Sequence, residues 1–253
     1  MSSIWFTIIV QPLYNLLIIF YNYLGSDMGI AIIAFTVLIR LIFWPSQAKA
    51  LKSQKELSEL QPEIDAIRKK YKDNPQKQSQ EMLSLYRTKK ISPFSSCLPL
   101  LIQFPILIAI YSIFQKNLNK ESLSWLYGFI SRPDNINVNF FGLVDLSQPE
   151  KIFFPIIAGI TQFILAWLTQ KNIKTQKKDN SNKKDQMFDI QSMLSKQMIY
   201  FFPIMIVIIS MSLPSALVLY WVITNIFMIV QQYIVNKGIA FRAPKVALKV
   251  KKK

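Results

Sequence analysis

The chain has 253 residues, of which 51% are hydrophobic, and it carries a formal net charge of +16 with no histidine and one cysteine. This composition is typical of a single polytopic membrane domain and excludes a soluble two-domain enzyme. The lone Cys97 excludes an internal disulfide, and the absence of histidine removes the commonest metal ligand and general base, so we expect neither a metal nor another cofactor.

Residues 1–27 are predicted to form an extracytoplasmic helix that lies in the membrane interface. Polar side chains recur at spacings of four, four and seven and share one stripe of this helix, namely Thr7, Gln11, Asn15 and Asn22. No basic region or cleavage site typical of a signal peptide is present, so we expect residues 4–24 to be retained. A membrane span kinked at Pro12 is the alternative, because no lysine reinforces the polar stripe.

Residues 28–45 form the first predicted span, whose apolar run from Gly29 to Pro45 contains one charge, Arg40. A guanidinium in hydrocarbon costs about 2.5–3.5 kcal/mol on insertion-based scales, so it requires a partner or water. None of the fourteen acidic residues falls inside an apolar segment, and we therefore infer a hydrated polar cavity around Arg40 that several helices line. Snorkelling of Arg40 to the headgroups is the alternative, although Trp44 and Pro45 lie beyond it.

Residues 46–91 are predicted to form a cytoplasmic helical hairpin, with eleven basic residues against six acidic ones. Apolar side chains along its first helix alternate steps of three and four, as in a coiled coil, at Leu57, Leu60, Ile64, Ile67 and Tyr71. The sequence Asp73-Asn74-Pro75 then ends this helix, and a second helix returns antiparallel to it.

Residues 92–114 form the second predicted span. Ser96 and Gln103 are seven residues apart and share one helical face, which we expect to meet the Thr36 and Arg40 face of the first span. Prolines inside this span are tolerated where neighbouring groups or water satisfy the carbonyls that they leave unpaired.

The second half of the chain alternates loops and spans. Residues 115–151, with four basic and four acidic residues, are predicted to form an extracytoplasmic loop, and residues 152–169 the third span. Residues 170–196 are rich in Lys, Asn and Gln, which predicts a flexible cytoplasmic loop. Residues 197–212 then form the fourth predicted span.

Residues 213–236 are predicted to comprise a turn and the fifth span, followed by a basic cytoplasmic tail at residues 237–253. Polar and aromatic side chains cover two neighbouring stripes of the fifth span, one with Tyr220, Thr224 and Gln231 and the next with Trp221, Asn225 and Gln232. The fifth span therefore presents a broad polar face to its neighbours.

Basic residues are distributed unevenly between the two sides that five spans would create. The hairpin, the 170–196 loop and the tail hold eleven, seven and seven of them, whereas the N-terminal segment and the 115–151 loop hold none and four. Because basic loops stay in the cytoplasm, this predicts an external N-terminus and a cytoplasmic C-terminus. Several predicted spans have only 16–18 residues, so we expect local thinning of the bilayer.

Short motifs stand in a characteristic order along nearly the whole chain. They are Gln11-Pro12, the run from Gly29 to Pro45 with its arginine, Leu60-Gln61-Pro62, Gln80-Glu81-Met82 with Tyr86, the run from Cys97 to Pro105, Asp145-Leu146-Ser147, Phe202-Pro203, and the run from Leu213 to Trp221 with Asn225, Gln231 and Gln232. In this order and spacing the sequence resembles the YidC family of membrane insertases, which has mitochondrial and chloroplast relatives.

The resemblance implies an all-α polytopic membrane protein with five transmembrane helices around a hydrophilic groove, an N-terminal interfacial amphipathic helix and a cytoplasmic helical hairpin. The groove arginine and glutamine of the family correspond to Arg40 and Gln103, and its fifth-span tyrosine and asparagine to Tyr220 and Asn225. The polar faces described above extend the predicted groove to Thr36, Ser96 and Thr224.

The resemblance also implies a non-enzymatic insertase that moves nascent membrane proteins from the cytoplasm into the lipid bilayer. Its implied partners are those nascent chains, the ribosome, which the basic hairpin and tail would contact, and the Sec translocon; no DNA partner is expected. The sequence lacks an Arg/Ser-rich presequence, which favours the inner (plasma) membrane of a bacterium over an organelle.

Two other classes of function are less compatible with the sequence. A small transporter or channel using Arg40 as an anion site would usually show repeated halves or ionisable relay residues, and neither is apparent. An intramembrane enzyme would need paired acids, a serine with a base, or a metal set inside the spans. No GxxxxGK[ST] nucleotide motif occurs, so substrate hydrophobicity and membrane potential are the expected driving forces.

Overall fold

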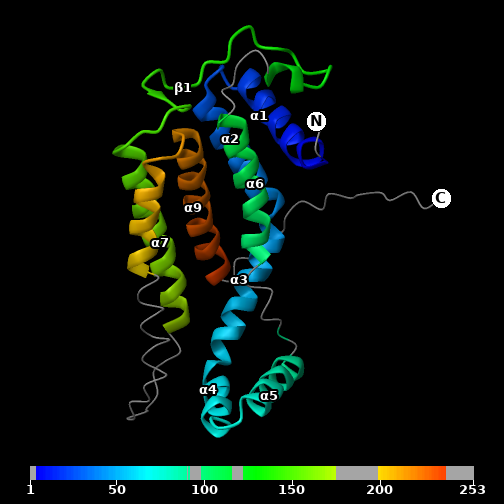
Figure 1. Ribbon diagram of the computed structural model, residues 1–253, viewed down its shortest axis with the longest axis vertical. Helices are drawn as coiled ribbons and strands as arrows, with labels where there is room; N and C mark the ends of the chain where they lie inside the picture. The colour runs from blue at the N-terminus through cyan, green and yellow to red at the C-terminus, as the bar shows by residue number, and fades with distance from the viewer. Residues whose placement is uncertain (1–3, 90, 92–97, 116–121, 175–198, 238–253) are drawn as a thin grey trace, which may run out of the picture.

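The computed structural model describes residues 4–89, 91, 98–115, 122–174 and 199–237. The described chain is mostly helical, and its helices run along one long axis, with loops at one end and a helical hairpin protruding at the other (Figure 1). The predicted class, an all-α polytopic membrane protein, is confirmed. The predicted Ser96, most of the 170–196 loop and nearly all of the 237–253 tail lie outside the described residues.

The N-terminal helix begins with a π-helical turn at Phe6–Val10 and continues without a break into α1, Gln11–Tyr23. Pro12 has no amide N–H to donate one turn back, so the preceding turn adopts a wider winding. One face of α1 is fully buried against α2 and the loops, through Tyr14 and Ile18, each 0% exposed. This helix is also long and apolar enough to cross a membrane, so its depth in the bilayer stays a prediction.

The polar stripe of the N-terminal helix binds the loop that follows α6. Asn15 donates from Nδ2 to the carbonyl oxygen of Trp125 at 2.9 Å and accepts from the amide of Tyr127 at 2.8 Å. Gln11 and Asn22 donate to loop carbonyls in the same way. These side chains therefore hold the loop on the helix. Their hydrogen bonds pair backbone groups of the loop that would otherwise be buried without a partner.

The first predicted span is a bent helix. α2, Met28–Ile42, starts where Asp27 accepts a hydrogen bond from the amide of Ile30 at 3.0 Å, and α3, Trp44–Glu59, leaves it at an angle of 62°. Pro45 stands in the first turn of α3 and cannot donate to the preceding turn, so the backbone bends there.

α3 extends beyond the bundle to the hairpin of α4, Gln61–Lys70, and α5, Pro75–Thr88. The apolar stripe predicted to run along one helix is divided at Leu60, because Pro62 opens a new helix there. An ion pair between Lys89 and Glu63 at 2.7 Å links the two arms of the hairpin.

The remaining elements complete the bundle and its cap. Their bounds are Leu98–Gln115 for α6, Ser122–Trp125 for a 3₁₀ turn, Asn139–Phe140 for β1, Val144–Asp145 for β2, Phe153–Lys174 for α7, and Ser215–Asn236 for α9, with a further helix at Ile199–Ser210. β1 and β2 pair antiparallel in a small ribbon at the loop end of the bundle. Its tight turn needs left-handed backbone at Phe141 and Gly142.

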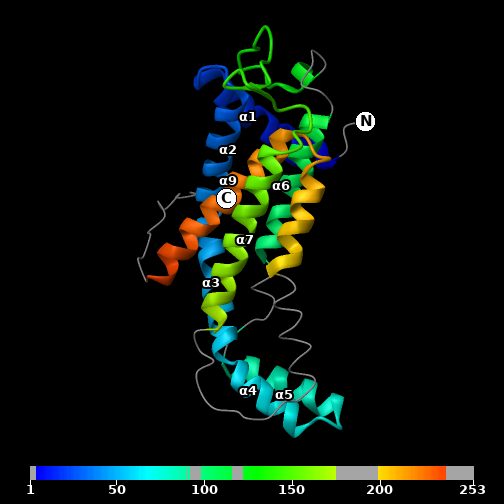
Figure 2. The same cartoon turned by 90° about the vertical axis from the view of Figure 1, so that its left-hand side faces the viewer.

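α9 packs against α2, α3, α6 and α7, and it lies between α7 and α6 in Figure 1. Figure 2 shows that α9 runs obliquely across the bundle. Gly159 of α7 allows close approach of the Ile199–Ser210 helix, since an added Cβ would lie 2.3 Å from a methyl group of Val207. By length and composition, three described helices qualify as membrane spans, or four if α2 and α3 form one, and two apolar helices are shorter. The number of spans and the membrane side of each loop stay predictions.

Candidate functional site

Arg40 lies at the junction of three helices. It is in the last turn of α2, its side chain is only 4% exposed, and its Nη2 donates to Oε1 of Gln103 on α6. The same nitrogen donates to the hydroxyl of Thr224 on α9 at 3.2 Å. The guanidinium therefore points into the bundle instead of extending to the protein surface, as snorkelling would require.

The network continues from Gln103 to a phenol. Nε2 of Gln103 donates to the hydroxyl of Tyr220, which is 0% exposed, at 3.0 Å. Gln103 thus accepts from a cation and donates to a hydroxyl, which fixes the orientation of its amide. Arg40, Gln103, Tyr220 and Thr224 together are called the arginine cluster below.

The positive charge of the arginine cluster has no anionic partner in the part of the chain that the structure describes. The ion pairs there join residues of α3 and of the hairpin, and none includes Arg40. Nε of Arg40 is buried and makes no hydrogen bond to any described residue. A buried donor left unpaired costs about 1–3 kcal/mol or more when charged, so this site retains capacity for water or a polar guest.

Two other predicted site residues have partners outside the arginine cluster. Thr36 is fully buried one turn before Arg40, but its hydroxyl donates to the carbonyl of Ile32 in its own helix at 2.6 Å. Asn225 is buried and donates from Nδ2 to the hydroxyl of Thr161 on α7 at 3.3 Å. The structure thus brings together four of the seven predicted residues, while Thr36 and Asn225 lie beside them with local or interhelical roles.

Polar contacts follow α9 towards the helical hairpin. Gln231 donates to the carbonyl of Trp44, at the bend between α2 and α3, at 3.1 Å, and Gln232 donates to the hydroxyl of Thr169 at 2.8 Å. Thr161 and Thr169 on α7 were not among the predicted site residues. Their spacing of eight, matched to the spacing of seven between Asn225 and Gln232, is the signal that would have indicated paired faces.

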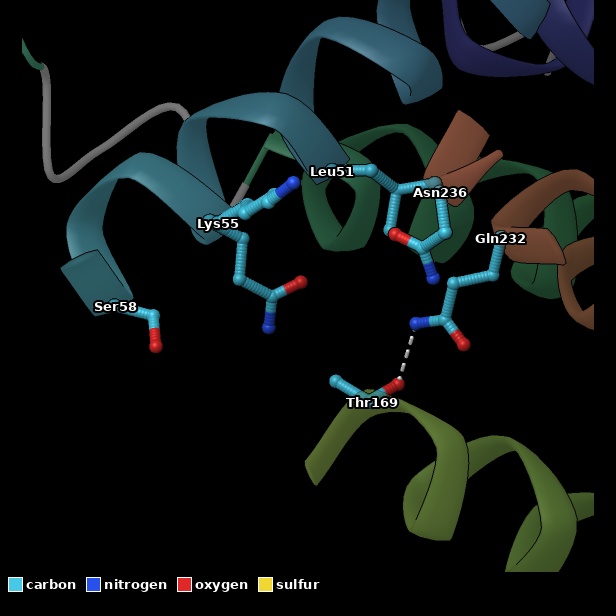
Figure 3. A pocket seen from close by; sticks show the side chains of 7 residues that line it. Leu51, Lys55, Ser58, Thr169, Gln232 and Asn236 are labelled. Atoms are coloured by element: carbon cyan, nitrogen blue, oxygen red, sulfur yellow. Dashed lines mark hydrogen bonds between the residues drawn. The ribbon is translucent and has the colours of Figure 1, made fainter. Parts of the chain in front are cut away.

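A small pocket opens where α9 ends beside α3. Its lining residues come from three helices, namely Leu51, Gln54, Lys55, Ser58, Thr169, Gln232 and Asn236. Figure 3 shows Lys55 and Ser58 of α3 on one side of this pocket, with Thr169 and Gln232 joined by their hydrogen bond on the other. The polar face of α9 therefore extends from the arginine cluster to the base of the hairpin.

Comparisons with known proteins show which family this chain belongs to. The family model described as 60Kd inner membrane protein matches residues 19–242. The membrane protein insertase YidC 1 of Halalkalibacterium halodurans is 39% identical over 254 residues, which cover 99% of this chain and 85% of that protein. This chain belongs to the YidC family. The predicted resemblance is confirmed, and the chain is a multi-pass membrane protein.

Other members of the YidC family are longer. The membrane protein insertase YidC of Cupriavidus taiwanensis is 36% identical over 234 residues, and that of Rickettsia akari is 32% identical over 240 residues. Each alignment covers 92% of this chain but only 36% and 39%, respectively, of those relatives. The chain thus spans little more than a third of the length of these YidC proteins. The arginine cluster, the pocket and the hairpin all lie within the residues that the family model matches.

Proposed function

We propose that this protein is a membrane protein insertase, which moves nascent membrane proteins from the cytoplasm into the lipid bilayer. The observation that carries the proposal is the arginine cluster, in which a buried guanidinium is held by neutral oxygens of α6 and α9. A polar segment crossing a bilayer loses its hydration at a cost of several kcal/mol per unsatisfied group. A charged donor with amide and hydroxyl partners inside the bundle would offset part of that cost.

The proposed route follows the polar face of α9. The helical hairpin lies on the cytoplasmic side of a bacterial inner membrane, with the N-terminus outside, and receives the nascent chain. The polar outer segment of the substrate then passes the pocket at Lys55 and Gln232 and reaches Arg40. Its apolar segment leaves into lipid along the outer surface of α7, where Ile156 and Ile160 are about half exposed, at 47% and 54%.

The proposed mechanism needs no covalent chemistry. Burial of the substrate span in lipid provides the driving force, and the membrane potential acts on its charged segment. The arginine cluster acts as a binding surface, and a cationic site favours substrates with acidic outer segments by Coulomb attraction. The ribosome and the Sec translocon are proposed partners, and the basic residues exposed on α4 and α5 offer a surface for ribosomal RNA.

Site-specific photo-crosslinking tests the proposal. A photo-reactive residue replaces Gln103 in the arginine cluster and, as a control away from the proposed exit along α7, Ile108, which is 46% exposed on the same helix, α6. We expect ribosome-held nascent chains to crosslink at position 103 over a limited range of chain lengths, in a variant that still inserts its substrate. No crosslink at 103, together with Arg40-dependent anion flux into liposomes, would replace the insertase with an anion transporter.

A further inference from the structure

The ribbon formed by β1 and β2 carries an exposed apolar tip. At this tip Phe141 is 66% exposed and Leu143 is 86% exposed, with Gly142 between them. No charged residue occurs in the segment from Phe140 to Val144. Two large apolar side chains presented together to water are unfavourable, and such a pair indicates a contact with another phase or molecule.

The tip is held in place by the backbone around it. Phe141 has φ +48° and Gly142 has φ +70°, and the left-handed conformation is rare for a phenylalanine. The amide of Phe141 donates to Oδ2 of Asp27 at 2.7 Å, while Oδ1 of the same carboxylate caps α2. Asp27 therefore couples the turn to the start of α2 and keeps Phe141 directed away from the core.

Both ends of the ribbon are also seated on the bundle. Phe140 packs so closely on α2 that a Cβ added to Gly29 would lie 1.9 Å from its ring. After β2, Leu146 is fully buried and its carbonyl accepts a hydrogen bond from the amide of Ala216, in the first turn of α9, at 2.9 Å. The tip therefore cannot turn inward to bury Phe141 and Leu143 without breaking these contacts.

We propose that Phe141 and Leu143 insert into the lipid leaflet at this end of the bundle and anchor the ribbon there. The next large apolar side chains along the chain that are exposed belong to Ile152 and Phe153, at 68% and 60%, where α7 and its exposed apolar face begin. In a multi-pass membrane protein this face contacts lipid, so the tip continues an existing lipid-facing surface. Figures 1 and 2 place the ribbon at the end of the bundle where α7 and α9 begin.

The anchor has a structural consequence for α2. Because Asp27 binds both the turn and the first turn of α2, lipid that holds the tip also restrains the helix that carries Arg40. This inference rests on membership of a membrane protein family and on the ribbon, and it stands independently of the insertase function.

Depth measurement by spin labelling tests the anchor. In the 253-residue chain carrying Cys97→Ser, a nitroxide is attached to Leu143→Cys or, as a matched control, to Asp134→Cys at an exposed site of the same loop. Each labelled protein is reconstituted as a single copy in phosphatidylethanolamine/phosphatidylglycerol nanodiscs. We expect the ratio of oxygen to nickel-chelate collisions to be several-fold higher at position 143 than at 134. Equal ratios would overturn the proposal.

Two further measurements cover a Leu143→Cys variant that does not fold and a tip that contacts a second copy of the chain instead of lipid. Phe141→Cys replaces Leu143→Cys if the latter does not fold, since both side chains belong to the tip. If the high ratio at the tip appears only when several copies share a vesicle and is lost in single-copy nanodiscs, the tip contacts a second copy of the chain and the lipid anchor is wrong.

Discussion

Arg40 organises the middle of the bundle because its hydrogen bonds join helices that are distant in sequence. Its partners Gln103 and Thr224 are 63 and 184 positions away along the chain. A guanidinium has five N–H donors in a planar fork, and the described partners use only part of that capacity. The side chain is therefore both a structural link and a site with donors left for water or a substrate.

Substitutions of Arg40 separate these two roles. Arg40→Ala removes the charge and is expected to reduce insertion of substrates with acidic outer segments by about tenfold or more, since a hydrogen bond to a charged group contributes about 1.5–3 kcal/mol. Arg40→Lys keeps the charge and should retain part of the activity. Insertion assays normalised to protein abundance measure both. Loss of Arg40→Ala from the membrane would instead assign Arg40 a structural role.

Gly29 is a second residue at this scale, because the ring of Phe140 leaves no space for a larger side chain at position 29. Gly29→Ala places a Cβ 1.9 Å from the ring of Phe140. Overpacking costs about 1–3 kcal/mol, against about 1 kcal/mol that alanine gains as a helix former, so we expect a net loss of thermal stability. In a Phe140→Ala background the same change should become neutral or stabilising. An unchanged effect of Gly29→Ala in that background would show that Phe140 does not cause it.

At the level of elements, helix starts and bends depend on single polar groups. α2 begins at Asp27, and α7 begins where the carboxylate of Glu150 accepts hydrogen bonds from the amides of Ile152 and Phe154 at 2.9 and 2.8 Å. The bend between α2 and α3 is held by Gln231 at the carbonyl of Trp44. These contacts set the angles at which the apolar helices meet.

Glu150 makes the start of α7 sensitive to acid. Burial, the largest single influence, raises the pKa of Glu150, but hydrogen bonds from the amides of residues 151–154 together lower it below its ordinary 4.5. A lowered pKa means that the ionised carboxylate stabilises the fold above the ordinary pKa, and that this contribution is lost as pH falls through the folded value.

Glu150→Gln is therefore expected to lower the thermal stability at neutral pH, because an amide is a weaker acceptor for the amides at a helix start. The difference from the unchanged protein should shrink as the pH falls below about 4.5. Melting curves in detergent at several pH values measure it, with Asp134→Asn as the control. A difference that is constant with pH would rule out the carboxylate charge as its cause.

The whole molecule has two chemically different ends. Among the residues that the structure describes, most of the basic side chains lie on α3 and on the hairpin of α4 and α5, whereas the ribbon end exposes apolar side chains such as Phe141 and Leu143. Such asymmetry matters in a membrane because basic segments are retained in the cytoplasm. The bundle between the ends presents apolar side chains outward and the arginine cluster inward.

This asymmetry predicts one orientation in the membrane. In a Cys97→Ser chain, Asp134→Cys in the loop and Ser79→Cys on α5 are both exposed. A membrane-impermeant maleimide added to intact spheroplasts should label position 134 and leave position 79 unlabelled until the membrane is opened. Labelling of position 79 in intact cells would reverse the proposed topology.

The sequence by itself determined the structural features that depend only on residues close together along the chain. The apolar runs, the lone charge at Arg40, the polar face of α9 and the stop at Asn74-Pro75 follow from local composition and periodicity. Local patterns also predicted the hairpin, but not the division of its first helix at Leu60, since a proline two residues later permits either a kink or a new helix.

Only the tertiary structure decided which polar groups meet. It pairs Gln103 with Tyr220 across 117 positions and Asn225 with Thr161 across 64, and it leaves Thr36 bonded within its own helix. It also seats the ribbon on Gly29, which makes its apolar tip point outward. Such pairs depend on how the helices are rotated and shifted against one another, and periodicity identifies a polar face without identifying the face that it contacts.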